Sequence, residues 1–207
     1  MNIVVFGATG TTGREVVAQA LEQGHTVTAF VRNPAKVEQA GPNLKIMQGD
    51  VLNPDDVAKA VQGQDAVLSS LGAGLNGTVR SQGTQNIIAA MQQANVRRLI
   101  SQSTLGAGDS RSNLNAYWKY LMFGLLLRRA YADHNRQEAF IRQSDLDWTI
   151  VRPGALTDDD RTGTYRHGFA PTDRTITLEI STADVAEFML KQMTDDTYLR
   201  AAPGLSN

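Results

Sequence analysis

The feature that most constrains the fold is a glycine-rich turn, GATGTTG at residues 7–13. It follows an apolar run from Ile3 to Phe6 and precedes an amphipathic stretch from Arg14 to Gln23. Glycines spaced by three between a strand and a helix allow a tight turn, close approach of the backbone to a diphosphate, and close helix–strand packing. The turn therefore predicts a parallel βαβ unit that holds the phosphates of a dinucleotide at the helix N-terminus.

Several members of this turn are candidate cofactor-binding residues. Gly7 permits the tight turn, Gly10 lets the backbone approach the diphosphate, and three threonine hydroxyls add hydrogen-bond donors. A glycine-rich turn without a ligand is the alternative, which the full strand–turn–helix context disfavours. The candidates are Gly7, Thr9, Gly10, Thr11 and Thr12.

Short apolar runs alternate with amphipathic stretches through residue 151, which is typical of a parallel sheet covered by helices. The expected strands are residues 3–6, 26–31, 45–48, 66–71, 99–103 and 148–151, and the expected helices are 14–23, 54–61, 82–93 and a long region at 113–143. We predict an α/β fold of the Rossmann type, with a doubly wound parallel sheet, in a single domain over residues 1–207.

The pattern changes after the strand that Pro153 and Gly154 stop. Short strands are expected at 164–166 and 175–179, and Ser181 is expected to cap a last helix that runs to about Met193. The loops on the substrate side are expected mainly at residues 105–135 and 154–180.

Composition narrows the class of protein. The formal charge is −1 and cysteine is absent, so no bulk charge favours nucleic acid, and disulfides and thiolate chemistry are excluded. No leader pattern precedes the first strand. The most apolar later stretch, residues 121–127, is shorter than the roughly 20 residues that span a bilayer and is interpreted as a buried helix segment or an exposed docking face. We expect a cytoplasmic monomer with no nucleic-acid partner and no membrane span.

The end of the second expected strand bears on the choice between NAD and NADP. An acidic residue there would bind the ribose 2′-hydroxyl, whereas an arginine accommodates a 2′-phosphate. Arg32 occupies this position, with Lys36 one turn beyond and no carboxylate at the strand end. A solvated Arg32 is the alternative. The residues favour NADP(H).

Further candidate cofactor-binding residues follow the third and fourth strands. Asp50 and Val51 would lie beside an adenine, although Asp50 is equally explained as a turn residue before the next helix. Leu71, Gly72 and Ala73 end the fourth strand, where small residues let a cofactor pass close to the backbone.

Four motifs together resemble the atypical short-chain dehydrogenase/reductases, a group that includes NmrA-like proteins and the biliverdin reductase B (flavin reductase) family. The similarity to the latter extends over nearly the whole chain. The four motifs are GATGTTG at 7–13, VRNP at 31–34, GDV at 49–51 and WTIVRP at 148–153, and the segments closer to biliverdin reductase B are 63–67, 86–91, 180–181 and 188–190.

The resemblance implies NADPH-dependent reduction of flavins and of linear tetrapyrroles. A serine that follows the fifth strand in that family lies near the nicotinamide and the substrate. The matching position here is Thr104, after Ser103, so the resemblance makes these two the candidate catalytic residues.

The chain departs from the family at other positions. A family arginine matches Gly74, and Arg80 is the nearby candidate cofactor-binding substitute. A family histidine on the helix before the sixth strand matches Glu138. Pro153 and Gly154 complete the candidate cofactor-binding residues.

The chain lacks the proton donor of the commoner short-chain dehydrogenases, because none of its five tyrosines is followed four residues later by lysine. A carbonyl substrate needs such a donor, whereas a flavin or bilin spreads the charge through a conjugated ring and can take its proton from solvent. The hypothesis is hydride transfer from NADPH to a stacked flavin or bilin. The alternatives are a non-catalytic, NmrA-like NADP(H) redox sensor and a quinone reductase.

The other polar groupings are weaker signals. The three histidines, His25, His134 and His167, lack metal-ligand spacing and are expected at the surface, so no metal is predicted. The run of aspartates at 158–160 is expected to be a solvated loop.

For two further clusters, one of arginines and one of aromatic residues, the sequence leaves two interpretations open. Arg128, Arg129 and Arg136 lie on an expected helix, either as a solvated face or as contacts for tetrapyrrole propionates. Tyr117, Trp118 and Tyr120 either wall a substrate pocket or serve packing alone.

Overall fold

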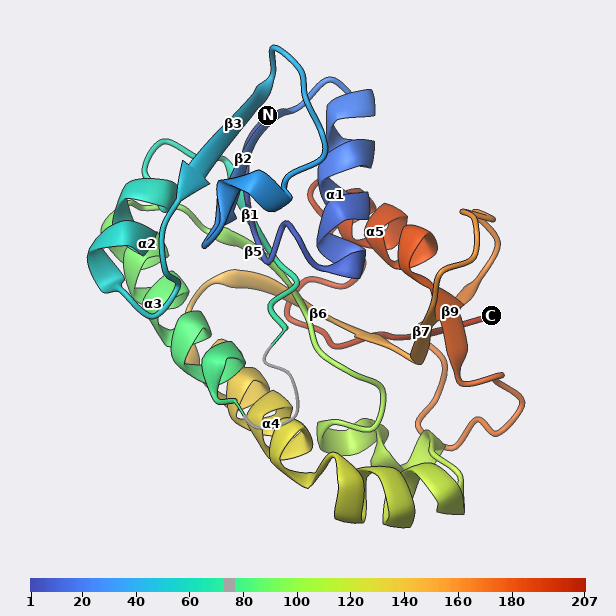
Figure 1. Cartoon of the computed structure of the whole chain (residues 1–207). Helices are drawn as coiled ribbons and strands as arrows, with labels where there is room; N and C mark the ends of the chain where they lie inside the picture. The colour runs from blue at the N-terminus through green and yellow to red at the C-terminus, as the bar shows by residue number, and fades with distance from the viewer. Residues whose placement is uncertain (73–76) are drawn as a thin grey trace.

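The computed structural model describes residues 1–72 and 77–207 and consists of a central sheet with helices on both faces (Figure 1). Its six long strands are β1 (Asn2–Phe6), β2 (Thr26–Val31), β3 (Leu44–Gln48), β4 (Ala66–Ser69), β5 (Arg98–Gln102) and β6 (Asp147–Pro153). They are parallel and run in the order β3-β2-β1-β4-β5-β6. This is the doubly wound Rossmann order, so the predicted fold class is confirmed.

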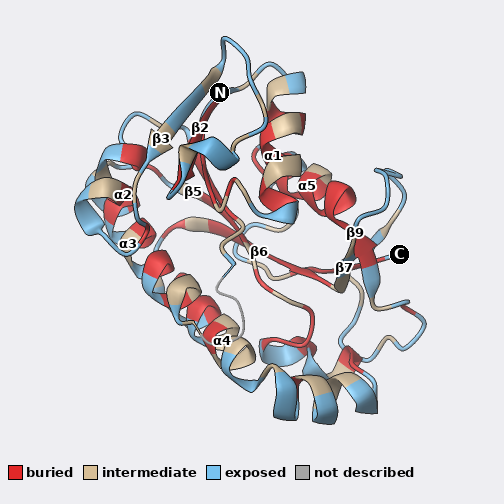
Figure 2. Cartoon of the chain, in the orientation of Figure 1, coloured by how far each residue is buried: buried red, intermediate tan, exposed pale blue. Residues whose placement is uncertain are grey.

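In the described part of the chain, five α-helices cover the sheet: α1 (Thr11–Glu22), α2 (Pro54–Val61), α3 (Val79–Gln93), α4 (Arg128–Gln143) and α5 (Thr182–Lys191). Helices α1 and α5 pack on one face and α2, α3 and α4 on the other (Figure 1). Side chains alternate along β1, so Ile3 and Val5 join the core beneath α1 and α5 while Val4 and Phe6 join the opposite core. Because helices cover both faces, β1, β2, β4, β5 and β6 are buried in their middle, whereas the edge strand β3 contains no buried residue (Figure 2).

The sheet continues beyond β6 through β10 (Gly204–Ser206), which the sequence pattern missed, and β8 (Arg166–His167), which overlaps the short strand expected at 164–166. Strand β10 pairs in parallel with β6, and β8 pairs antiparallel with β10. A separate two-stranded sheet joins β7 (Ala155–Thr157) to β9 (Glu179–Ser181), which places the second expected short strand several residues too early. Strands of two or three residues carry no periodicity, so tertiary pairing defines them.

The helical region predicted at 113–143 is confirmed for most of its length, but it is not one continuous helix. The chain forms a 3₁₀-helix, η2 (Gly108–Asn113), then a π-helix, η3 (Tyr117–Leu126), and α4 begins only at Arg128. Residues 117–127 are apolar almost throughout, so periodicity could not locate the break. Another short 3₁₀-helix, η1 (Pro34–Lys36), follows β2. Within the described part of the chain, no helix is both long and apolar enough to cross a membrane.

Candidate functional site

The glycine-rich turn joins β1 to α1 and leaves no space for side chains at two of its glycines. Gly7 has a φ of +83°, and a Cβ there would lie 2.5 Å from the carbonyl oxygen of Ser70. A Cβ on Gly13 would overlap the carbonyl oxygen of Gly7. The glycines therefore hold the turn against both α1 and the end of β4, as the spacing of the motif predicts.

The first turn of α1 is prepared for an anion. Gly10 is the N-cap residue and supplies no side-chain cap, and the first turn contains no acidic residue. The hydroxyl oxygen of Thr12 is buried and has no hydrogen-bond partner among the residues that the structure describes. A phosphate at this point would satisfy both the free backbone N–H groups and the buried hydroxyl, so these residues fit a dinucleotide.

A groove, here called the glycine cleft, runs along the carboxyl ends of the parallel strands from β3 to β6. One half reaches β2 and β3, and the other reaches β5 and β6; both contain Gly10, Ser70, Leu71 and Gly72. The predicted residues that line it are Gly7, Thr9, Gly10, Thr11, Thr12, Arg32, Val51, Leu71, Gly72, Arg80, Ser103, Thr104, Pro153 and Gly154.

Two predicted cofactor-binding residues that the structure describes, Lys36 and Asp50, do not line the cleft. Lys36 lies exposed at the end of η1. The carboxylate of Asp50 accepts a hydrogen bond from the backbone N–H of Leu52 at 3.0 Å, which is the turn-residue alternative. Ala73 lies outside the described residues. Sequence reasoning also missed Ser70, which closes the cleft beside Gly7 and Gly13.

A second hollow of about 440 Å³, here called the apolar cavity, adjoins the cleft. Its lining is mainly aliphatic and aromatic, with Trp118 and Phe123 contributed by η3. The cavity and the cleft share Arg80, Thr104, His134, Gly154 and Leu156. The two hollows therefore meet at the predicted catalytic position.

Arg80 enters this junction from the first turn of α3. Its side chain is 13% exposed and its guanidinium lies 3.8 Å from the carboxylate of Asp133. Burial lowers the pKa of Arg80, and the charge of Asp133 partly offsets that effect. Asp133 also accepts the backbone N–H groups of Arg80 and Ser81, both at 3.2 Å, so it caps α3 from α4. Sequence reasoning missed Asp133 because the two helices are about 50 residues apart.

His134 is half-buried, so the prediction that this histidine lies at the surface is wrong. Its Nδ1 lies 3.4 Å from the hydroxyl oxygen of Ser103, and its ring lines both hollows. Burial, together with the nearby charge of Arg80, lowers the pKa of His134 to about 3, and an interaction with the side chain of Gln137, which favours the protonated ring, offsets part of that effect. The imidazole is therefore neutral, with one nitrogen able to donate and the other to accept.

This pKa predicts a pH dependence of stability. From pH 6.5 down to about 3 the unfolded chain binds a proton on His134 that the folded chain does not, so stability falls as pH falls. At pH 5 we expect His134 to contribute a loss of about 2 kcal/mol relative to pH 7. Urea unfolding of the wild type and of His134→Asn at both pH values measures it. Equal losses in the two proteins would contradict the assignment.

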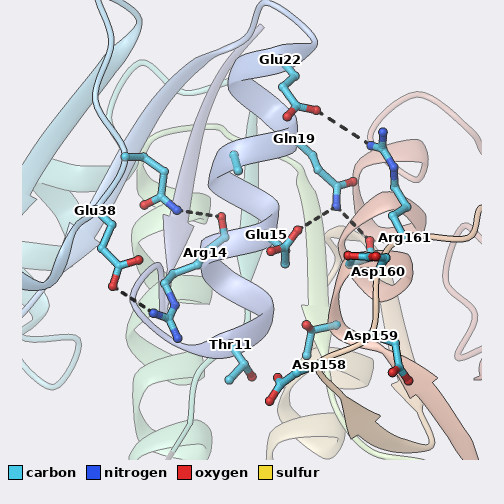
Figure 3. A pocket seen from close by; sticks show the side chains of 14 residues that line it. Thr11, Arg14, Glu15, Gln19, Glu22, Glu38, Asp158, Asp159, Asp160 and Arg161 are labelled. Carbon is cyan, nitrogen blue, oxygen red and sulfur yellow. Dashed lines mark hydrogen bonds and ion pairs between the residues drawn. The ribbon is translucent and has the colours of Figure 1, made fainter.

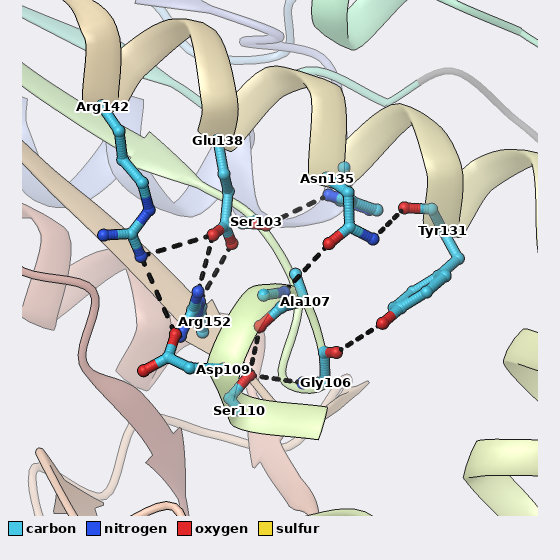
Figure 4. Close-up of polar contacts among 12 residues, drawn as sticks. Ser103, Gly106, Ala107, Asp109, Ser110, Tyr131, Asn135, Glu138, Arg142 and Arg152 are labelled. Carbon is cyan, nitrogen blue, oxygen red and sulfur yellow. Dashed lines mark hydrogen bonds and ion pairs between the residues drawn. The ribbon is translucent and has the colours of Figure 1, made fainter. Parts of the chain in front are cut away.

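The backbone beneath the apolar cavity is fixed by polar contacts from α4 (Figure 4). The side chain of Asn135 accepts the N–H of Gly108 at 3.0 Å, and the hydroxyl of Tyr131 donates to the carbonyl oxygen of Gly106 at 3.0 Å. The Tyr131 hydroxyl is therefore directed to the backbone, although its ring lines the cavity.

A buried ion pair anchors the same region. Arg152 on β6 binds both carboxylate oxygens of Glu138, at 3.0 and 2.6 Å, and reaches Asp109 at 2.7 Å (Figure 4). Burial opposes the charge of Arg152, but its hydrogen bonds to Glu138 and Asp109 prevail and raise its pKa. Glu138, the position that matches a family histidine, thus faces β6; His134, one turn earlier, faces the cavity.

The remaining clusters lie elsewhere. Between α1 and residues 158–161 is a polar hollow in which Arg14 pairs with Glu38 at 3.1 Å and Arg161 lies 4.0 Å from Glu22 (Figure 3). The aspartates at 158–160 are exposed, and no metal-binding group of acids or histidines occurs in residues 1–72 or 77–207. Arg128, Arg129 and Arg136 are exposed and do not line the cavity, and of the aromatic cluster only Trp118 does.

Comparison with known proteins agrees with a dinucleotide-binding site. A family described as NAD(P)H-binding matches residues 7–196. The photosystem II assembly factor Ycf39 of Synechocystis sp. is 27% identical over 218 residues, an alignment that covers 97% of this chain and 60% of Ycf39. This chain thus spans about three fifths of the length of that relative.

Solved structures share the fold over the whole chain. The oxidoreductase ylbE of Lactococcus lactis has a TM-score of 0.84 at 25% identity and covers 100% of this chain and 91% of its own. ChuY of Escherichia coli O157:H7, described as an anaerobillin reductase, has a TM-score of 0.83 at 22% identity, with coverage of 100% and 97%. A short-chain dehydrogenase/reductase of Veillonella parvula in complex with NADP has a TM-score of 0.81 at 20% identity, with coverage of 100% and 94%.

Proposed function

This chain belongs to the NAD(P)H-binding family, and on that premise we propose that it is an NADPH-dependent reductase of planar conjugated acceptors, of the flavin or linear-tetrapyrrole type. The observation that carries the proposal is the junction between the two hollows. A nucleotide-sized cleft and an apolar cavity meet at Thr104 and His134, so two rings can lie against each other there. ChuY, a structural neighbour described as an anaerobillin reductase, supports tetrapyrroles as candidate acceptors.

Different residues along the cleft and the cavity have different roles in this proposal. The turn at 7–13 and the hydroxyl of Thr12 hold the phosphates, and Arg32 faces the adenosine end of the cleft. A bound NADPH would supply the hydride for the acceptor and be oxidised to NADP⁺, and water would supply the proton that completes the reduction. Thr104 and Ser103 orient polar groups of the reacting rings, and Trp118 and Phe123 keep water from the faces of those rings.

Arg32→Glu is expected to lower the affinity for NADPH about 100-fold and to leave the affinity for NADH within about threefold. The reversed charge would repel a 2′-phosphate and accept a hydrogen bond from a 2′-hydroxyl. Fluorescence titration with each dinucleotide measures both values. Lys36→Glu is the matched control, since Lys36 does not line the cleft. Equal losses for NADH and NADPH would contradict the role of Arg32.

Thr104→Ala is expected to lower turnover about tenfold without changing the dissociation constant of NADPH. A hydroxyl that orients the acceptor is useful but is not the proton donor, because the proton comes from solvent. Steady-state turnover and a binding titration on the same preparation separate the two effects. Complete loss of turnover with intact NADPH binding would instead make the hydroxyl an essential acid.

A quinone is the second candidate acceptor. Among the described residues that line the apolar cavity, Arg80 is the only charged one. An uncharged ring matches that lining better than an acceptor that carries two carboxylates.

The test is a turnover screen of NADPH against FMN, biliverdin and quinones, followed by the loss of NADPH absorbance. Turnover with at least one class supports the proposal. Tight NADPH binding with no turnover in any class would favour a redox sensor of the NmrA-like kind.

A further inference from the structure

Several large apolar side chains of η3 are exposed to solvent. Tyr120 is 72% exposed, Leu125 69% and Leu126 59%, and Tyr117 and Leu121 lie on the same helix at 54% and 44%. These five residues are called the η3 face below. A group of large exposed apolar side chains on one element usually marks a binding surface, whereas scattered single ones need no explanation.

The charged residues of the segment that carries the η3 face have one sign. Residues 110–132 contain Arg111, Lys119, Arg128 and Arg129 and no aspartate or glutamate, in a chain whose formal charge is −1. Leucines beside tyrosines and basic residues form the composition of helices that lie in the interface of an anionic bilayer. Tyrosine rings suit the headgroup region because they combine an apolar ring with a polar hydroxyl.

The inner side of the same helix forms part of the apolar cavity. Trp118 and Phe123 of η3 line it, together with Leu127 directly after the helix. One side of η3 therefore lines the cavity, and another side carries the η3 face. A partner surface bound to the η3 face would lie next to the cavity.

We propose that the η3 face docks on an anionic lipid bilayer, and that the apolar cavity takes a lipid-dissolved planar acceptor of the quinone class from that bilayer. The second half of this inference rests on the proposed reductase function; the docking does not. Leu125, Leu126 and Leu121 insert among the acyl chains, and Lys119 and Arg128 meet the phosphate groups.

A second copy of the chain fits the η3 face less well than an anionic bilayer does. A two-fold interface would set the basic segment against itself, and residues 110–132 supply no carboxylate to neutralise it. Anionic lipid supplies the opposite charge.

Vesicle sedimentation without NADPH tests the docking on the full chain. The wild type should bind vesicles of phosphatidylcholine plus phosphatidylglycerol and bind phosphatidylcholine vesicles much more weakly. Leu125→Ser combined with Leu126→Ser should weaken binding about tenfold or more, and Lys119→Gln with Arg128→Gln should remove the preference for anionic lipid. Leu199→Ser is the matched control, because Leu199 is 40% exposed and lies outside η3. It should bind like the wild type.

The docking is overturned if the wild type does not sediment with anionic vesicles, or if the leucine double variant binds them as well as the wild type. A wild-type dimer in ultracentrifugation that the double variant converts to monomers, with no vesicle binding, would assign the η3 face to self-association instead.

Turnover separates the two halves of the inference. The double variant should lose about tenfold of its activity with a long-tailed quinone dissolved in vesicles and keep its activity with a short, water-soluble quinone. Equal loss with both quinones would overturn the delivery of the acceptor from lipid. Vesicle binding with no turnover of any acceptor would leave the docking in place and reject the reductase function.

Discussion

Glu138→Gln is expected to destabilise the protein by about 3 kcal/mol, measured as the free energy of unfolding in urea at pH 7. The side chains of Arg152 and Glu138 are 2% and 4% exposed, and two hydrogen bonds of 3.0 and 2.6 Å join them. Removing the charge of Glu138 leaves the guanidinium buried with Asp109 as its remaining close anion. Because β6, α4 and the loop at residues 105–113 meet at this pair, the cavity wall should loosen as well.

Two controls make the effect specific to burial. Arg97→Gln removes a more exposed ion pair to Asp147, of 2.9 Å, and should cost less than about 1 kcal/mol. Replacing both buried partners, by Arg152→Met with Glu138→Leu, should recover part of the stability lost by Glu138→Gln. If Glu138→Gln and Arg97→Gln cost the same, burial does not govern the strength of the pair.

Gly13→Ala is expected to weaken NADPH binding about 100-fold or more, which corresponds to about 2.7 kcal/mol of binding free energy. The added methyl group would overlap the carbonyl oxygen of Gly7 and lie 2.9 Å from the hydroxyl of Ser70. Relief requires α1 to move away from the turn, which displaces the N–H groups and the Thr12 hydroxyl that face the phosphates. Titration of the folded protein with NADPH measures the loss.

Gly41→Ala is the matched control, since a Cβ there meets nothing within 4 Å. It should leave NADPH affinity unchanged. Thermal unfolding of both variants shows whether Gly13→Ala acts beyond a general loss of stability. Wild-type affinity in Gly13→Ala would mean that the turn does not hold the phosphates.

Most of the sheet could be predicted because each long strand is recognisable from its own short run of residues. A strand buried on both faces is a continuous apolar run, as at Ile3 to Phe6, and the helices between strands repeat their apolar residues at helical spacing. The first turns of α1 and α3 begin three residues before the predicted starts, because Thr11 and Val79 precede the first clear apolar repeat.

The junction between the glycine cleft and the apolar cavity could be predicted only in part from the sequence. Ser103, Thr104 and Arg80 were placed by resemblance, and each lines the cleft. His134 and Asp133 carried no local signal, since a histidine or aspartate on a helix is ordinary until a neighbouring element buries it. The pKa of His134 depends on that burial and on Arg80, which comes from a different helix.

The sequence alone determined the glycine turn, the order of strands and helices that follows from it, and the absence of a tyrosine–lysine proton donor. These are properties of residue types at fixed short spacing, and backbone geometry turns them into structure directly. Only the tertiary structure decided that Arg152 pairs with Glu138, that β10 extends the sheet, and that η3 turns Trp118 inward and Tyr120 outward. Each of those depends on the meeting of segments far apart in the chain, where burial, and not residue type, sets charge, exposure and role.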